Sequence, residues 1–231
     1  MNNPIETASS QLAPVPLRID IVSDVVCPWC IIGYRQLQRA LEQMAGSFEV
    51  EIHWQPFELN PEMPDEGQEI REHLAQKYGS TAEQSRGVRS RLTELGESLG
   101  FKFDYYDGMR MYNTFQAHQL LYWAAQKHLQ TELKMALFEA FFSHRQNISD
   151  PAVLVQIAGS VGLDAAEAQR VLASACYAEE LRAEQARWLD RDVHAVPMFF
   201  FNHGFPVPGA QDASTFVKVL TRLAKKTAEE N

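Results

Sequence analysis

Two cysteines with two residues between them are the side chains best suited to do chemistry, in the sequence Cys27-Pro28-Trp29-Cys30. At this spacing one thiol can form a mixed disulfide with a substrate and the other can resolve it, which is dithiol–disulfide exchange. Proline suits the first turn of a helix, where its missing N–H costs nothing. Cys27 is therefore predicted to lie at a helix N-terminus, where unpaired amides and the helix dipole stabilise a thiolate and lower its pKa. We predict that Cys27 and Cys30 are catalytic and form a redox-active disulfide.

Other uses of the cysteine pair are disfavoured by the rest of the sequence. A zinc site needs two further ligands, and neither the third cysteine, Cys176, nor the seven histidines supply a pair at zinc-finger spacing. A permanent disulfide that closes so short a loop would stabilise the fold little. We therefore predict no metal and no organic cofactor, and we interpret Cys176 as a buried, inert thiol.

Two predicted strands and a predicted helix surround the cysteine pair. Residues 17–21 alternate apolar and charged side chains at the strand period, and residues 48–54 do the same. Between them an apolar stripe at helical spacing runs from Tyr34 to Met44, and Gly46 suits the end of that helix. Because the connections are short, this order predicts a strand–helix–strand unit with parallel strands.

Helical signals dominate the middle of the chain. Ser80-x-x-Glu83 is a predicted capping box ahead of an apolar stripe, and Pro151 is placed at a predicted first helical position. Asp164-x-x-Glu167 predicts the start of another helix. This section is therefore expected to form several short helices packed together.

Strand patterns return near the end of the chain. Residues 198–201 and 205–207 are apolar and are separated by Asn202-His203-Gly204, which favours a hairpin turn. Asp212 can cap a final helix. The whole pattern predicts a small α/β domain interrupted by a helical insertion.

Four segments between residues 17 and 223 form a specific set. They are Asp24-Val25-Val26-Cys27-Pro28-Trp29-Cys30-Ile31-Ile32-Gly33, Phe57-Glu58-Leu59-Asn60-Pro61, Asn113-Thr114-Phe115-x-Ala117-His118, and Val196-Pro197 through Gly209-Ala210-Gln211. Together they resemble the DsbA family of thioredoxin-fold thiol–disulfide oxidoreductases, and more closely its FrnE-type branch. The resemblance implies a thioredoxin-like α/β fold with an α-helical insertion domain. We place the thioredoxin-like domain at residues 17–62 and 180–231 and the insertion at 63–179.

The resemblance also implies roles for residues around the cysteine pair. A cis-proline at the place of Pro197 lies against the dithiol in thioredoxin-like enzymes, and the preceding residue, here Val196, offers its backbone to an extended substrate. Trp29 is interpreted as a substrate contact, with covering of the helix start as the alternative. Asn113 and His118 are expected on a helix that faces the active site, and a purely structural histidine is the alternative.

The predicted function is that of a thiol–disulfide oxidoreductase acting on a protein or small-molecule thiol or disulfide, with glutathione left open as a partner thiol. Kappa-class glutathione transferases and 2-hydroxychromene-2-carboxylate isomerases resemble the same layout. They use a serine where Cys27 stands, and Cys30 would have no purpose in them. A chaperone-like module that binds unfolded chains is a further alternative.

Composition and charge limit the choice of partners. Asp and Glu number 30 against 21 Lys and Arg, a formal net charge of −9. Nucleic acids and anionic membranes demand concentrated positive charge, so neither is a predicted partner. No apolar run reaches the ~20 residues of a membrane span, and Met1 to Pro16 has no secretory-signal pattern, so we expect a cytoplasmic protein. A homodimer is left open, because a helical insertion offers a surface for one.

Overall fold

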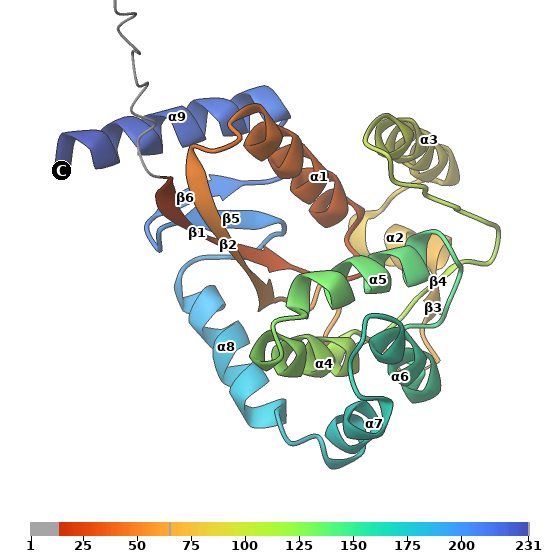
Figure 1. The fold of residues 1–231 in the computed structure, drawn as a ribbon. Helices are drawn as coiled ribbons and strands as arrows, with labels where there is room; N and C mark the ends of the chain where they lie inside the picture. The colour runs from red at the N-terminus through yellow and green to blue at the C-terminus, as the bar shows by residue number, and fades with distance from the viewer. Residues whose placement is uncertain (1–13, 65, 231) are drawn as a thin grey trace, which may run out of the picture.

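A four-stranded mixed sheet positions the cysteine pair (Figure 1). The computed structural model describes residues 14–64 and 66–230, so residues 1–13 of the stretch searched for a secretory signal lie outside it. The elements in chain order are β1 (Val15–Ser23), α1 (Pro28–Gln43), β2 (Phe48–Pro56), β3 (Gln68–Glu69), α2 (Ile70–Tyr78), α3 (Ala82–Ser98), β4 (Arg110–Met111), α4 (Phe115–Gln126), α5 (Gln130–Phe142), α6 (Pro151–Ser160), α7 (Ala165–Ser174), α8 (Ala178–Asp190), β5 (Met198–Phe201), β6 (Phe205–Pro208) and α9 (Ala213–Glu230). The larger sheet has the order β2-β1-β5-β6.

The strand pairings confirm the predicted strand–helix–strand unit and the predicted hairpin. β1 pairs in parallel with β2 along its whole length, from Val15 opposite Phe48 to Ser23 opposite Pro56. β5 pairs antiparallel with both β1 and β6. β1 is therefore a central strand. The residues that follow its C-terminal end, which lead to the cysteine pair, lie beside the middle of the sheet and not beside one of its edge strands.

Alternation along the strands sends apolar side chains to both faces of the sheet. On one face Phe199 of β5 packs against Phe216 of α9, with ring centroids 5.0 Å apart, and α1 lies beside α9 in Figure 1. On the other face Phe200 packs against Trp188 of α8, also with ring centroids 5.0 Å apart. Phe201 returns to the first face, where its ring approaches Phe216. The three consecutive phenylalanines are thus core residues.

Most predicted helix starts are confirmed, and one is shifted. The Asp150 side chain accepts a hydrogen bond from the backbone of Ala152 at the start of α6, and Asp164 and Asp212 cap α7 and α9 in the same way. The predicted capping box at Ser80 is wrong by one residue, because Thr81 and Gln84 form it at the start of α3. The backbone N–H of Ser80 instead bonds to the last turn of α2.

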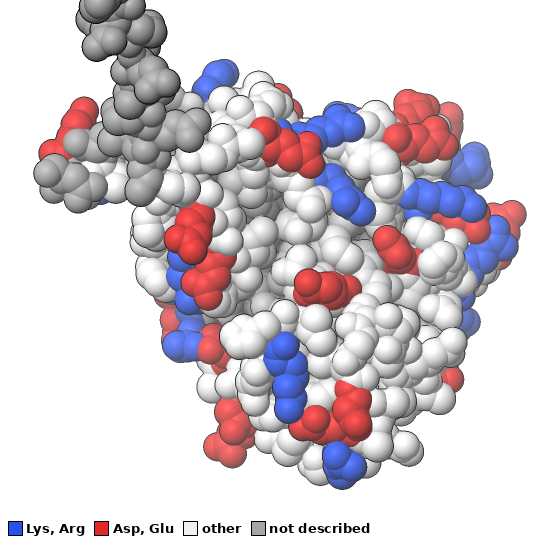
Figure 2. Space-filling model, viewed as in Figure 1, with Lys and Arg blue, Asp and Glu red and all other residues white. Residues whose placement is uncertain are grey.

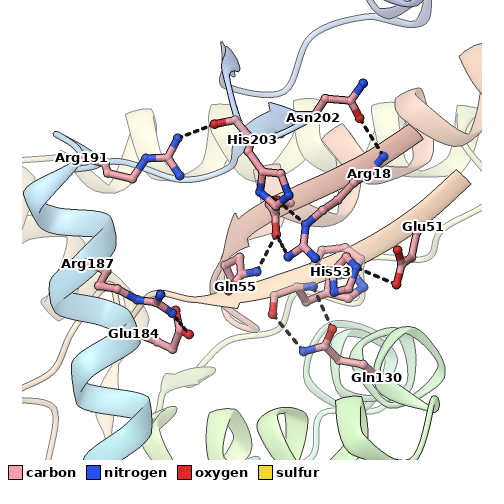
Figure 3. Close-up of polar contacts among 12 residues, drawn as sticks. Arg18, Glu51, His53, Gln55, Gln130, Glu184, Arg187, Arg191, Asn202 and His203 are labelled. Atoms are coloured by element: carbon pink, nitrogen blue, oxygen red, sulfur yellow. Dashed lines mark hydrogen bonds and ion pairs between the residues drawn. The ribbon is translucent and has the colours of Figure 1, made fainter. Parts of the chain in front are cut away.

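A single side chain ties the helices to the edge of the sheet. β2 is an edge strand, and at Trp54 its free N–H and C=O are both bonded by the amide group of Gln130, at 2.9 Å each (Figure 3). The indole N–H of Trp54 donates to the hydroxyl of Thr131 at 3.0 Å. The start of α5 therefore replaces a further strand at this point and fixes the position of α5 against the sheet.

Charged groups are mixed on the surface. Figure 2 shows acidic and basic side chains interspersed on the face in view, with no continuous basic area there. None of the helices in the described part of the chain has both the length and the apolar composition needed to cross a bilayer.

Candidate active site

The cysteine pair lies at the N-terminus of α1, as predicted. Cys27 is the N-cap residue, with extended backbone angles, and Pro28 occupies the first turn. The Cys30 backbone N–H donates to the Cys27 carbonyl oxygen at 3.1 Å, and both cysteines are free thiols. Cys27 is 3% exposed and lies on the wall of a cavity, whereas Cys30 is fully buried and is not part of that wall. The two sulfurs therefore differ in their access to a substrate.

The peptide bond before Pro197 lies next to the thiol of Cys27. The Val196–Pro197 peptide bond is cis, and the Cys27 thiol lies 3.7 Å from the Val196 carbonyl oxygen, to which it donates. Pro197 is therefore one peptide bond away from the oxygen that the thiol contacts, and its own contact with the dithiol stays a prediction. Trp29 and Val196 are half-buried and lie on the same cavity wall as Cys27.

The predicted lowering of the Cys27 pKa is wrong. The pKa of this thiol lies well above its ordinary value, first because of its hydrogen bond with the Cys30 thiol, then because of burial, and also because the Asp24 carboxylate opposes a second negative charge. The backbone amide of Cys30, which belongs to the helix N-terminus, acts in the predicted direction and is outweighed. The sequence indicated the helix terminus correctly but not how deeply the sulfur is buried.

Behind the thiols lies a buried group of charged and polar side chains. The carboxylate of Asp24 accepts hydrogen bonds from the Leu59 backbone N–H at 2.7 Å and from the His118 ring at 3.2 Å. Burial alone would raise the pKa of Asp24, but these hydrogen bonds and the charge of Lys134 hold it below the ordinary value. The resemblance predicted that the helix of His118 faces the active site. In the structure the His118 ring forms a hydrogen bond with Asp24, which lies three residues before Cys27.

Lys134 is the cation of this buried group. Its side chain is 1% exposed, and its ammonium group donates to the Ser23 carbonyl oxygen at 3.5 Å and lies 5.3 Å from the centre of the Trp54 ring. Burial lowers the pKa of Lys134 to about 8, although Cys30, Asp24 and Cys27 act to raise it. The sequence analysis did not single out this residue, and the available signal was a lone lysine next to the apolar stripe of α5.

Two other residues singled out in the sequence lie elsewhere. Asn113 organises the loop before α4, since its amide donates to the Met63 carbonyl oxygen at 3.2 Å and accepts from the Phe115 N–H at 2.9 Å. Cys176 is exposed, so the prediction of a buried thiol is wrong. It lies outside any helix, in the turn between α7 and α8 that follows Ala175 with φ +48°. Within the described residues no group of three or more histidine, cysteine or acidic side chains is arranged to hold a metal ion.

A thioredoxin-like sheet whose first helix begins at a Cys-x-x-Cys pair, with a cis-proline directly after the residue whose carbonyl the first thiol contacts, defines the class of thioredoxin-fold dithiol oxidoreductases. The more particular assignment follows from sequence. The chain belongs to the family of the DSBA-like thioredoxin domain, which it matches over residues 18–221.

Individual relatives agree with this assignment. The uncharacterised protein YwbO of Bacillus subtilis is 28% identical over 211 residues, which cover 91% of this chain and 98% of YwbO. The crystal structure of a probable DsbA oxidoreductase from Streptomyces coelicolor is 31% identical, covers 89% of each chain and superposes with a TM-score of 0.84. The chain is a DsbA-like thiol–disulfide oxidoreductase.

Two more distant structures share the fold. A 2-hydroxychromene-2-carboxylate isomerase is 14% identical with a TM-score of 0.68, covering 93% of this chain and 99% of its own. The cytosolic disulfide reductase DsbM from Pseudomonas aeruginosa, in a structure with glutathione, is 17% identical with a TM-score of 0.59, covering 90% of this chain and 99% of its own. The layout shared with the isomerase, expected from the sequence, is confirmed at the level of the fold.

Proposed function

We propose that Cys27 is the thiol that forms a mixed disulfide with the substrate and that Cys30 resolves it. The observation that carries this assignment is the difference in access, because Cys27 lies on the cavity wall and Cys30 lies wholly behind it. A substrate sulfur can reach the first thiol without entering the core. The second thiol then needs to reach only its neighbour on the same helical turn.

In the reducing direction the chemistry proceeds in two exchanges. The Cys27 thiolate attacks one sulfur of a substrate disulfide, which forms the mixed disulfide and releases the first substrate thiolate to take up a proton. Cys30 then loses its proton and attacks the Cys27 sulfur, which releases the second substrate thiolate and leaves the Cys27–Cys30 disulfide. The substrate gains two electrons and two protons, and the dithiol loses them.

The surroundings of Cys27 suit substrate binding. Trp29, Val196 and Pro197 are proposed to contact the substrate, with Trp29 and Val196 supported by their places on the cavity wall and Pro197 by its peptide bond to Val196. The Val196 carbonyl oxygen, 3.7 Å from the Cys27 sulfur, would accept a hydrogen bond from an extended substrate bound beside the thiol. In this arrangement the helical insertion, residues 63–179, supplies the opposite wall.

The environment of Cys27 favours reduction of substrates. A Cys-x-x-Cys disulfide is strongly oxidising when its reduced form is stabilised. Here the hydrogen bond with Cys30, then burial, and to a smaller extent Asp24 raise the pKa of Cys27, so its surroundings add no net stabilisation of a Cys27 thiolate. We expect a reduction potential closer to the value of about −270 mV typical of thioredoxin than to the value of about −120 mV of a strong oxidant. Equilibration against glutathione buffers measures it.

A reducing role fits a cytoplasmic enzyme that exchanges electrons with glutathione, and we include both in the proposal. The shared fold of DsbM, named as a cytosolic disulfide reductase and determined with glutathione, supports this part. The thiolate of one glutathione then attacks the Cys27–Cys30 disulfide to form a mixed disulfide, and a second glutathione attacks that mixed disulfide, which restores the dithiol and releases glutathione disulfide.

Trapping the mixed disulfide tests the assignment of the two thiols. Reduced protein carrying Cys176→Ser, which removes the exposed thiol, is incubated with insulin after a second change to Cys30→Ser or Cys27→Ser. We expect a stable insulin adduct on Cys27 in the Cys30→Ser protein and none in the Cys27→Ser protein, detected by mass spectrometry. An adduct on Cys30 instead would reverse the roles. A chaperone-like binder would retain insulin equally in both proteins without a covalent bond.

A further inference from the structure

The cavity beside Cys27 is large enough for a small molecule. Its volume is about 540 Å³, and it lies between the dithiol and the helices α2 and α3. Apolar side chains such as Leu74, Leu92 and Met111 form much of its wall, and the exposed side chains of Tyr78 and Val88 lie at its rim. Volumes of this size are typical of sites for small organic ligands.

Three buried polar atoms on this wall lack a partner. They are the hydroxyl of Ser85, the Nε of Arg89 and the hydroxyl of Tyr105, none of which has a hydrogen-bond partner among the described residues. Ser85 is 5% exposed, and it lies one helical turn before Arg89 on α3, on the same face as Val88 and Leu92. Burying a donor without a partner is costly, so three of them on one wall point to a ligand that accepts hydrogen bonds there.

The charge of Arg89 indicates what that ligand carries. No ion pair of the described residues includes Arg89, so no carboxylate among them balances the charge that it places on the cavity wall. The Tyr105 phenol lies within the electrostatic reach of both Arg89 and Cys27, and burial raises its pKa first of all, so it stays a hydrogen-bond donor. A guanidinium and two hydroxyl donors together match an acidic group.

We propose that this cavity selects a low-molecular-weight thiol or disulfide in which an apolar body joins the sulfur to an acidic group. Ser85, Arg89 and Tyr105 receive the acidic group, the apolar wall covers the body, and the sulfur faces Cys27. Away from Val196, apolar side chains such as Leu74, Leu92 and Met111 offer no partner to peptide amides, which favours an aryl or alkyl body. The inference rests on the proposed function, since Cys27 must be the attacking thiol.

Two disulfide probes of similar size separate the acidic group from the sulfur chemistry. Dithiobis(nitrobenzoic acid) carries a carboxylate on each ring, and dithiodipyridine carries none. Each probe is reduced by the dithiol to two thiols while Cys27 and Cys30 become a disulfide, and each releases a coloured product that gives the rate. All proteins carry Cys176→Ser, because the exposed Cys176 would react with both probes.

The measured quantity is the rate with the acidic probe divided by the rate with the neutral one. We expect Arg89→Met to lower this ratio about tenfold and Tyr105→Phe to lower it about threefold, as lost charged and neutral hydrogen bonds would. Arg86→Met is the matched control, since Arg86 is exposed on the same helix and its loss removes an equal charge. This control should keep the ratio.

Each outcome has one meaning. A ratio that Arg89→Met leaves unchanged, or that Arg86→Met lowers equally, overturns the inference even if both probes react quickly. Suppose that Arg89→Met lowers the rate with glutathione disulfide but not the rate with dithiobis(nitrobenzoic acid). That result would assign the cavity to a peptide thiol, and it would also overturn the inference. If the reduced protein reacts with neither probe through Cys27, the proposed function itself fails.

Discussion

Replacement of Lys134 by methionine is expected to remove a rise in stability at alkaline pH. The folded protein loses the Lys134 proton near pH 8, because burial lowers this pKa, whereas the unfolded chain keeps the proton until the ordinary value of 10.5. Between these two values the unfolded state binds more protons than the folded state. The contribution of Lys134 to the free energy of unfolding therefore increases with pH across this window, and Lys134→Met removes that contribution.

The size of the effect follows from the two pKa values. Each pH unit well inside the window contributes about 1.4 kcal/mol to the free energy of unfolding. Near the folded-state pKa the contribution per pH unit is smaller, because only part of the folded protein has lost the proton. From about pH 7 to about pH 9.5 the contribution of Lys134 sums to about 2 kcal/mol. Below this window both states are protonated, so the buried charge opposes folding at neutral pH without any pH dependence.

Urea unfolding at several pH values, followed by circular dichroism, measures the difference between the parent protein and Lys134→Met. Both proteins carry Cys27→Ala and Cys30→Ala, so that thiol ionisation, which has the opposite sign, does not enter. Because the two cysteines also act to raise the pKa of Lys134, the folded-state pKa is lower in this background and the rise in stability begins at a lower pH. Lys102→Met is the control, because Lys102 is exposed. A difference that stays constant from neutral to alkaline pH, or that matches the Lys102 control, would refute the conclusion that burial controls this lysine.

Two further predictions concern α3 and the dithiol. Gly96→Ala should lower the free energy of unfolding by about 1–3 kcal/mol, because the new Cβ would lie 2.5 Å from the Phe103 ring. Gly87→Ala on the same helix is the control. Its Cβ would meet nothing within 4 Å, so this change should raise the free energy of unfolding by about 0.5–1 kcal/mol. Thermal unfolding checks both, and equal effects would contradict the packing argument. Asp24→Asn should lower the pKa of Cys27, since the carboxylate opposes the thiolate. The ultraviolet absorbance of the thiolate during a pH titration measures it, and an upward shift would show that Asp24 acts otherwise.

Local signals in the sequence predicted the fold well. The alternation at residues 17–21 and 48–54, the proline at 151 and the aspartates at 164 and 212 each depend on neighbours within a few residues, and each marks an element in the structure. The two-residue strands β3 and β4 were not predicted, because a strand of this length is too short to show an alternating pattern. The start of α3 was displaced because Ser80 completes the end of α2.

The candidate site was predictable in its sulfur atoms and not in its electrostatics. The positions of Cys27 and Val196 followed from local pattern and family resemblance, and the structure brings the Cys27 thiol and the Val196 carbonyl together. The pKa of Cys27 depends on the hydrogen bond with Cys30, on burial and on Asp24, and the charge behind it comes from Lys134, more than a hundred residues away in sequence. Such long-range burial has no local signature, which is also why Cys176, in a turn between helices, was wrongly expected to be buried.

The pairing of β1 with β5 has a consequence for synthesis of the chain on the ribosome. Ile19 pairs with Phe201, so one side of the central strand has no partner until translation has passed that residue. The helices of residues 63–179 make mostly near-neighbour contacts and emerge whole before then, and elements with such contacts form first. Val196, whose carbonyl flanks Cys27, emerges just before β5. The contact of the Cys27 thiol with this carbonyl can therefore form only near the end of translation.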